Sequence, residues 1–339
     1  MTRMRALTVG CRGALVVLLA SGCGKDSPAG PGDTVPQPEC TKAPSGRTDA
    51  HTPISVVSDW GQPVRLGPPV NSPCPEDAIE IARDGQYLYF LFTKDILENL
   101  TPSEILSRPN GTYRAKRGGG PGDFDAPVFY DLGAGIDQSL DGEPSFSPDG
   151  RQVYFHSARA TNSGYQQVPP ADDFLDIYVA DVVDGRPGPG RNLGPPVNSI
   201  FPDGEHAIHP DGVTLYFASL RPGGLGKSDI WRSTWSGTAW STPVDVGAPV
   251  NSAGGDLQPA FTADGDTMYF VSDRNPLIGA AIYRCARRGD GWGAPELVLK
   301  GVVGEPSLTA DGRLLYFVHV LTDAQGPFDA DVWFTERVP

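Results

Sequence analysis

The sequence is short of positive charge. Its 339 residues include 27 Lys and Arg against 41 Asp and Glu, a formal net charge of −14. A protein that binds nucleic acid needs a basic surface to neutralise phosphates, so this balance argues against a nucleic-acid partner. Cysteine is scarce as well, and the five cysteines include no CxxC pair and no accompanying cluster of histidines. We therefore expect no metal site built on them.

The common catalytic signatures are missing too. There is no G-x-S-x-G and no H-E-x-x-H segment, which argues against a serine hydrolase and a zinc protease. Gly226-Lys227-Ser228 resembles the end of a phosphate-binding loop, but Arg221 stands where that motif requires its first glycine. We therefore expect no enzyme activity and no cofactor.

Helical patterns are rare, whereas glycine and proline are frequent. The chain has 42 Gly and 34 Pro, and the segments between them are short and alternate apolar with polar residues. This alternation is typical of strands joined by turns. The composition therefore predicts an all-β fold.

The first residues have the layout of an export signal. Arg3, Arg5 and Arg12 precede an apolar run over residues 14 to 19 that is too short to span a bilayer. The run ends in Ala20-Ser21-Gly22-Cys23, which resembles a bacterial lipobox. The resemblance implies that residues 1–22 are a lipoprotein signal peptide and that Cys23 carries a lipid. An ordinary signal peptide with an incidental cysteine is the alternative.

Residues 23–52 are rich in Pro, Gly, Ser and Asp and have no apolar period, which is typical of a flexible tether. Gly24 follows the lipidated cysteine, and by resemblance to lipoprotein sorting this favours the outer membrane, with the protein facing the periplasm or the cell surface. In an oxidising compartment Cys40 and Cys74 are candidates for a disulfide, whereas Cys285 lies in a strand pattern and is expected to be buried and free. The globular domain is then expected at residues 53–339.

One unit recurs five times in that domain. Each copy contains Asp-Gly followed by an alternating segment that ends in Tyr-Phe, which predicts a β-hairpin with Asp-Gly in the turn. The five anchor aspartates are Asp84, Asp149, Asp211, Asp264 and Asp311. A third strand opens near an Asp-Ile-Tyr type motif, and a fourth carries Trp-x-x-Pro, with proline accepted because this strand is at the sheet edge.

Four-stranded units repeated around an axis are blades of a β-propeller. The last copy stops after its third strand, while residues 54 to 66 form a spare fourth strand at the N-terminal side. We therefore predict a single propeller of five blades whose last blade is closed by the N-terminal strand. A sixth, degenerate blade within residues 97 to 127 is the alternative.

The repeats resemble those of a known family. SPDGRQVYFHSAR and HPDGVTLYFASLRPGGLGKSDIWRS are similar to the WD-40-like, Pro-Asp-Gly propeller repeats of the TolB type. The resemblance covers residues 54 to 339 and implies the propeller fold. It implies little about activity, because propellers serve as binding modules and as enzymes.

One position of the repeat suggests a site at the centre of the propeller. Six residues before the anchors stand Ala78, Glu143, Glu205, Gln258 and Glu305, at the start of each innermost strand. Converging carboxylates there could bind a cation such as calcium or a basic segment, and Glu143 with Glu305 could act as a glycosidase pair. We favour a structural role, in which each side chain caps backbone N–H groups of the neighbouring blade, because the position recurs in every copy.

Other polar residues have weaker claims. Arg221 and Asp229 are expected to form an inter-strand ion pair. His206 and His209, close to Glu205, could ligate a metal, but we expect them to be satisfied core or surface residues. Irregular segments at residues 97 to 123 and 160 to 173 are candidate partner-binding loops. The first contains three cations, Arg114, Lys116 and Arg117.

Together these features predict a monomeric, lipid-anchored binding platform of the cell envelope that recognises another envelope protein or a peptide. Two alternatives stay open. One is a five-bladed carbohydrate-active enzyme that uses the central carboxylates, and the other is a structural lipoprotein with no specific ligand.

Overall fold

The computed structural model describes residues 47–93, 111–133, 140–159, 161–163 and 175–338. All of them belong to one compact unit, Thr34–Pro339. This part of the chain is built from strands and turns, and it holds no helix of the length and apolarity that crossing a membrane requires.

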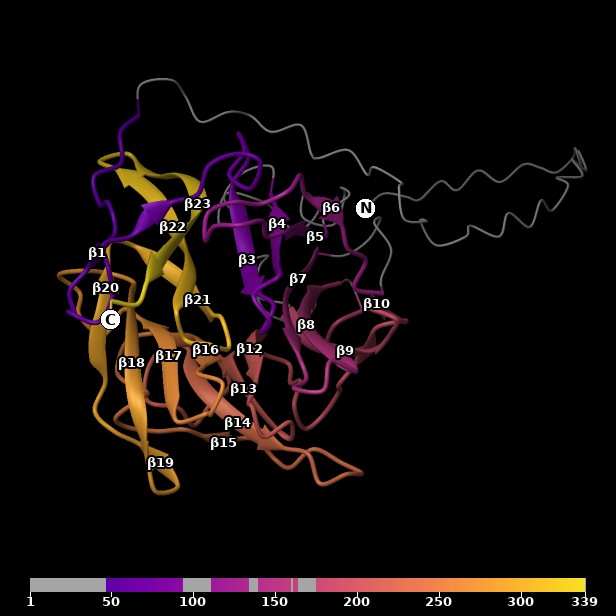
Figure 1. The fold of residues 1–339 in the computed structure, drawn as a ribbon. Coiled ribbons are helices and arrows are strands. Elements are labelled where there is room, and N and C mark those ends of the chain that lie inside the picture. The colour runs from indigo at the N-terminus through magenta and orange to yellow at the C-terminus, as the bar shows by residue number, and fades with distance from the viewer. Residues whose placement is uncertain (1–46, 94–110, 134–139, 160, 164–174, 339) are drawn as a thin grey trace, which may run out of the picture. The chain divides into compact units, whose positions relative to one another are not determined.

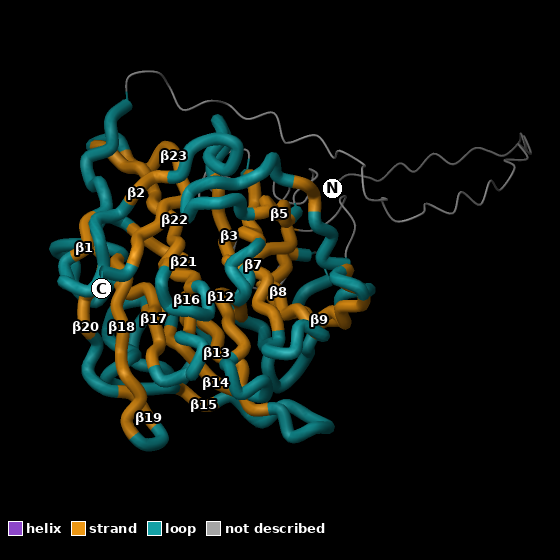
Figure 2. Tube along the Cα trace, viewed as in Figure 1, coloured by secondary structure: helices purple, strands orange, loops and turns teal. Residues whose placement is uncertain are grey.

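The strands form five antiparallel sheets (Figures 1 and 2). The first two blades follow the chain from the innermost strand outward. Blade 1 contains β3 (Glu76–Ile81), β4 (Tyr87–Phe92), β5 (Thr112–Lys116) and β6 (Val128–Phe129). Blade 2 contains β7 (Leu140–Phe146), β8 (Gln152–Ala158), β9 (Leu175–Val183), and the short β10 (Arg186–Pro187) and β11 (Arg191–Asn192).

The remaining blades repeat this order. Blade 3 contains β12 (Asp203–Ile208), β13 (Thr214–Ser219), β14 (Asp229–Thr234) and β15 (Val244–Asp245). Blade 4 contains β16 (Asp256–Phe261), β17 (Thr267–Ser272), β18 (Ala281–Arg288), β19 (Gly291–Trp292) and β20 (Glu296–Lys300). Blade 5 contains β21 (Val303–Leu308), β22 (Leu314–Asp323) and β23 (Gly326–Glu336).

The innermost strands close a ring. Each contacts the next in the order β3, β7, β12, β16 and β21, and β21 contacts β3 again. The five-bladed β-propeller is therefore confirmed. The alternative of a sixth blade within residues 97 to 127 is wrong, because β5 is the third strand of blade 1 and pairs with β4.

The N-terminal segment closes the ring, as predicted, but as two short strands. β2 (Val64–Arg65) pairs with β23 and supplies the missing outer strand of blade 5. β1 (Ile54–Ser55) pairs instead with β20 at the edge of blade 4. The Trp-x-x-Pro motif precedes the outer strand, since Pro63 stands just before β2. The segment therefore ties two blades together.

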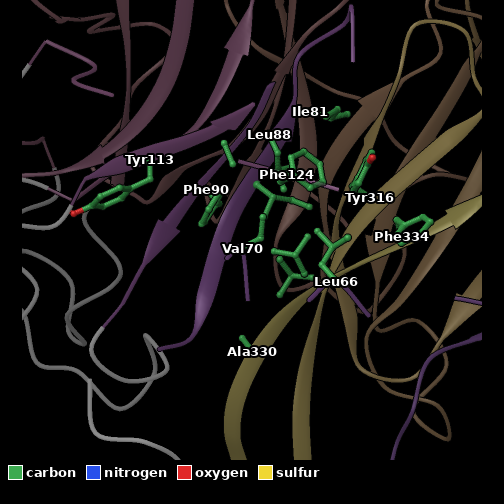
Figure 3. Close-up of a cluster of buried hydrophobic side chains, with 14 of the residues drawn as sticks. Leu66, Val70, Ile81, Leu88, Phe90, Tyr113, Phe124, Tyr316, Ala330 and Phe334 are labelled. Carbon is green, nitrogen blue, oxygen red and sulfur yellow. The ribbon is translucent and has the colours of Figure 1, made fainter. Parts of the chain in front are cut away.

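The Tyr-Phe motif explains how the blades pack. Successive residues of a strand point to opposite faces, so in every blade the tyrosine packs against the next blade and the phenylalanine against the previous one. Between blades 5 and 1, for example, Tyr316 and Phe90 share one buried cluster (Figure 3). Five such clusters, one at each blade boundary, make up the core.

The Asp-Gly turns form as predicted. Each anchor carboxylate accepts a hydrogen bond from the backbone N–H two residues later, as between Asp149 and Arg151 at 3.1 Å. The following glycines have φ between 65° and 75°, a left-handed conformation that glycine adopts without strain. The turns fix the register of every hairpin.

The ion pair expected between Arg221 and Asp229 is wrong. Arg221 reaches inward instead and pairs at 2.5 Å with Asp203 on the innermost strand of its blade, and Arg274 pairs likewise with Asp256 at 2.7 Å. Asp229 accepts hydrogen bonds from the backbone N–H groups of Leu225 and Gly226. The same arginine–aspartate pair occurs within blade 3 and within blade 4, so these contacts belong to the fold.

Candidate functional site

The position six residues before each anchor has an unusual backbone. All five residues there adopt φ between 47° and 54°, although none is glycine, and the register of each innermost strand shifts at this point. A β-bulge of this kind redirects a side chain, and a left-handed non-glycine residue costs about 1–3 kcal/mol. The ring therefore keeps these side chains at its centre although the left-handed backbone conformation is energetically unfavourable.

The bulged side chains connect neighbouring blades. Glu305 of blade 5 accepts a hydrogen bond from the backbone N–H of Ile79 in blade 1 at 2.9 Å. Gln258 of blade 4 accepts one from the backbone N–H of Glu305, also at 2.9 Å. These contacts are of the capping kind that we favoured from the sequence.

The carboxyl groups converge as expected; Glu143 and Glu305 are buried and Glu205 is partly buried. Burial, together with repulsion from Glu143, raises the pKa of Glu205 to about 8. Burial, together with neighbouring carboxylates, also raises the pKa of Glu143 and of Glu305 well above the ordinary value. Burial therefore favours the protonated form of all three side chains.

Glu80, two residues past the bulge of blade 1, was not singled out from the sequence. Its carboxylate accepts a hydrogen bond from the Ser307 hydroxyl at 2.6 Å, and burial raises its pKa to about 7. Ser307 belongs to a Glu-Pro-Ser segment that also occurs at residues 143–145. That recurrence is the signal that could have identified it, because the serine in each copy accepts a hydrogen bond from the backbone of the next blade, Ile81 N–H or Ile208 N–H.

The cavity at the centre is small. Glu80, Glu143, Gln258 and Glu305 line a cavity of about 50 Å³. Pockets for organic ligands are typically about 300–1,000 Å³, whereas a site of this size holds a few water molecules or an ion.

A second hollow lies where the hairpin turns of blades 2 and 3 meet. We call it the turn-face groove; it has a volume of about 850 Å³ and is formed by residues 147–149, 151–152, 181–184 and 210–212. Four aspartates line it: Asp149, Asp181, Asp184 and Asp211. Arg151 is the one cation among its lining residues, and Arg191, outside them, pairs with Asp181 at 2.8 Å. The groove is therefore acidic and of ligand size.

The three cations expected on a binding loop are not gathered on one. Arg114 and Lys116 belong to β5, and the Arg114 guanidinium lies 4.9 Å and 4.7 Å from the ring centres of Tyr87 and Tyr130. Arg117 follows the strand and approaches Gly85 in the neighbouring turn. Most of the two candidate loops, at 97 to 123 and 160 to 173, lies outside the described residues.

The histidines differ in their surroundings. His209 lies beside Asp211, with Nδ1 3.1 Å from the carboxylate, as expected of a satisfied residue. His206 is buried, and within the described residues neither ring nitrogen has a well-formed hydrogen bond, although the Tyr154 carbonyl faces the ring. His156, which we did not assign to a site, lies close by, with ring centres 6.3 Å apart.

Cys285 is buried and free, as expected. Cys74 is buried and part of a disulfide. Cys23 and Cys40 lie outside the described residues, so the lipid on Cys23 and the pairing of Cys40 with Cys74 stay predictions. Residues 47–52, placed at the end of the tether, contact blade 5, where Arg47 pairs with Asp323 at 2.5 Å.

The fold and its centre define a five-bladed β-propeller with a ring of buried carboxyl groups. No family model matches the chain. An uncharacterized protein of Agrobacterium fabrum is 29% identical over 139 residues, which cover 40% of this chain and 41% of that protein. The match thus spans less than half of this curated relative.

Several solved structures share the fold. A glycoside hydrolase has a TM-score of 0.52 at 11% identity, with 85% of this chain and 92% of that chain covered. An α-L-arabinofuranosidase from Lactobacillus brevis has a TM-score of 0.48 at 15% identity, covering 79% and 92%. A protein of Agrobacterium tumefaciens assigned as TolB has a TM-score of 0.41 at 16% identity, covering 79% and 92%. The propeller agrees with the TolB-type resemblance of the repeats, and at these identities the similarity concerns the fold alone.

Proposed function

We propose that this protein is a non-catalytic binding platform of the bacterial cell envelope, and that its turn-face groove binds a cationic segment of another envelope protein or a peptide. The observation that carries the proposal is the contrast between the two hollows. The groove, at about 850 Å³, is of ligand size and acidic, whereas the centre, at about 50 Å³, is nearly filled. The net charge of −14 adds a long-range attraction for cations.

A hydrolytic role for Glu143 and Glu305 has less support. A glycosidase needs one ionised carboxylate beside one protonated carboxyl group, with room for a sugar between them. Here burial raises the pKa of both groups, and Glu305 is bonded to the backbone of the next blade. If Glu143→Gln abolished hydrolysis of a glycan in a substrate panel, the protein would be an enzyme and the platform proposal would fail.

The groove can be tested without disturbing its turns. Asparagine keeps the turn chemistry of aspartate but removes the charge, so we expect a variant with Asp149, Asp181, Asp184 and Asp211 all changed to Asn to fold normally. Four exposed charges contribute a few tenths to 1 kcal/mol each, so partner binding should weaken about tenfold or more. Cross-linking and mass spectrometry of the native protein in its own envelope measure the loss.

The matched control changes four exposed aspartates in turns of other blades to Asn: Asp84, Asp264, Asp290 and Asp311. It should retain the partner. Equal capture by both variants would place the partner elsewhere, and capture of no protein at all would favour a structural lipoprotein without a specific ligand.

The envelope location rests on the N-terminal signal and on the lipid proposed for Cys23. The disulfide of Cys74 supports export, because disulfides persist in oxidising compartments. We expect Cys23→Ser to move the protein from the membrane fraction to the soluble periplasmic fraction, with loss of metabolic labelling by a fatty acid. Fractionation with Cys285→Ser as the control distinguishes lipidation from general misfolding, and unchanged membrane association of Cys23→Ser would contradict the anchor.

A further inference from the structure

Two buried histidines interrupt the repeat. His156 stands seven residues after its anchor, where the other blades have apolar residues: Leu91, Ala218, Val271 and Val318. His206 stands directly after the bulge, where the other blades have Ile79, Pro144, Pro259 and Pro306. A residue that serves the blade itself recurs in the other copies, so the two histidines serve something that occurs once in the ring.

The two histidines meet a carboxylate at the junction of blades 2 and 3. Glu143 comes from the bulge of β7, His156 from β8 and His206 from β12 (strands in Figure 1). One ligand atom from each lies within 4.8 Å of the other two, and all three side chains are buried. His156 Nδ1 is 3.2 Å from Glu143 Oε2. At Gly142 a Cβ would lie 2.9 Å from Ala78 and Leu91 and 3.1 Å from His156 Nε2, so glycine makes room for the imidazole and for both apolar side chains.

These groups are poorly satisfied. Among the described residues, Glu143 Oε2, His156 Nδ1 and both ring nitrogens of His206 are buried and none has a well-formed hydrogen bond, although the Tyr154 carbonyl faces the His206 ring. A buried polar atom without a partner costs about 1–3 kcal/mol. One atom from each of the three residues faces the other two, so a single bound ion would satisfy all three together.

We infer that Glu143, His156 and His206 form a binding site for one divalent transition-metal ion of the zinc class. Imidazole suits zinc, copper, iron and nickel, whereas calcium takes oxygen ligands, so the two histidines disfavour the calcium ion considered from the carboxylates alone. Two histidines and one glutamate form a known zinc ligand set, with a fourth position left for water.

The spacing is close to what zinc requires. Two ligand atoms at about 2.1 Å from a tetrahedral ion lie about 3.4 Å apart. The pair formed by Glu143 and His156 already has this separation, at 3.2 Å, and all the ligand atoms lie within 4.8 Å of one another. A side-chain rotation that shortens the longest separation by at most about 1.4 Å completes the site.

The surroundings also suit a metal. The Tyr154 carbonyl faces the His206 ring, where a second ring nitrogen of a metal ligand typically finds its acceptor. Glu143 and His206 line the central cavity, so the fourth position opens to water there. This site is independent of the turn-face groove, and either proposal can fail without the other.

Zinc titration of untagged protein, stripped with a chelator, tests the inference. Wild type should bind one Zn²⁺ per chain in calorimetry and melt several degrees higher with it, and Co²⁺ in its place should give the visible bands of four-coordinate cobalt. The repeat itself supplies conservative variants. His156→Val copies blades 4 and 5, His206→Ile copies blade 1, and Glu143→Gln copies blade 4. Each should weaken zinc binding by more than about 100-fold, the most that outer-shell substitutions cost.

Stability without metal separates a ligand from a structural residue. The two histidine variants remove unpartnered polar atoms, so in chelator they should melt at or above the temperature of wild type, and zinc should no longer raise it. No saturable zinc binding by wild type would overturn the inference. The inference would also be overturned if all three variants bound zinc as tightly as wild type. It would be overturned likewise if the histidine variants melted below wild type in chelator while Glu143→Gln kept its zinc affinity.

Discussion

Trp60→Ala is expected to lower the free energy of unfolding by about 3–5 kcal/mol, the usual cost of removing a large buried aromatic side chain. Trp60 is 2% exposed and lies in the N-terminal segment between β1 and β2. Its ring packs in the cluster between blades 4 and 5, and its indole N–H donates to the Tyr269 hydroxyl at 3.2 Å. Loss of this side chain therefore weakens the attachment of the segment that closes the ring.

Urea unfolding followed by circular dichroism measures the change, and Trp235→Ala is the control. Trp235 is 37% exposed and lies near the outer edge of blade 3, away from the closure. It should cost less than about 1 kcal/mol, as is usual for surface substitutions. Equal costs for the two variants would mean that the N-terminal segment contributes nothing special to the ring.

Raising the pH from 6.5 to 9 is expected to destabilise the metal-free protein. Burial raises the pKa of Glu80 to about 7 and of Glu205 to about 8, whereas an unfolded glutamate titrates near about 4.3. A carboxyl group whose pKa is raised by folding contributes its full stability at pH values below the unfolded pKa. This contribution is lost as the pH rises from the unfolded pKa to the folded pKa. Over that interval each such group lowers the free energy of unfolding by about 1.4 kcal/mol for every unit that the pH rises.

The buried histidines do not change the stability between pH 6.5 and 9. Burial lowers the pKa of His206 to about 3 and also lowers the pKa of His156, so their contribution is lost only below about pH 6.5. Urea unfolding at a series of pH values in chelator measures the slope, which Glu205→Gln should reduce below pH 8. Gln258 shows that an amide fits this position. The exposed Glu336→Gln should leave the slope unchanged, and a stability that rises from pH 6.5 to 9 would contradict the buried carboxyl groups.

Much of the fold could be predicted because the repeat encodes it locally. Asp149-Gly150 needs no distant contact to form its turn, and Tyr316-Phe317 must point to opposite faces of any strand. The pairing of β2 with blade 5 followed from counting strands. The pairing of β1 with blade 4 did not, because it depends on where residues 54–66 cross between two blades.

The site was less accessible to sequence reasoning because it depends on contacts between blades. The repeat predicted that Glu143 and Glu305 lie at the centre, but it did not predict their hydrogen bonds. It also predicted the wrong partner for Arg221, because Asp203 on the innermost strand was not considered. His156 was overlooked, although aligning the five copies shows histidine where every other blade is apolar. The turn-face groove could not be foreseen, because three separate turns form it.

Site-specific photo-cross-linking in the native envelope tests the central claim, that the turn face recognises a partner. Val183 lies in the groove and is 69% exposed, whereas Leu277, 91% exposed, lies on the loop between the second and third strands of blade 4, at the other end of the strands. We predict that a photoreactive residue at position 183 captures one defined partner, that the four Asp→Asn changes in the groove abolish this capture, and that position 277 captures none. Capture of the same partner from position 277, with none from position 183, would contradict the account.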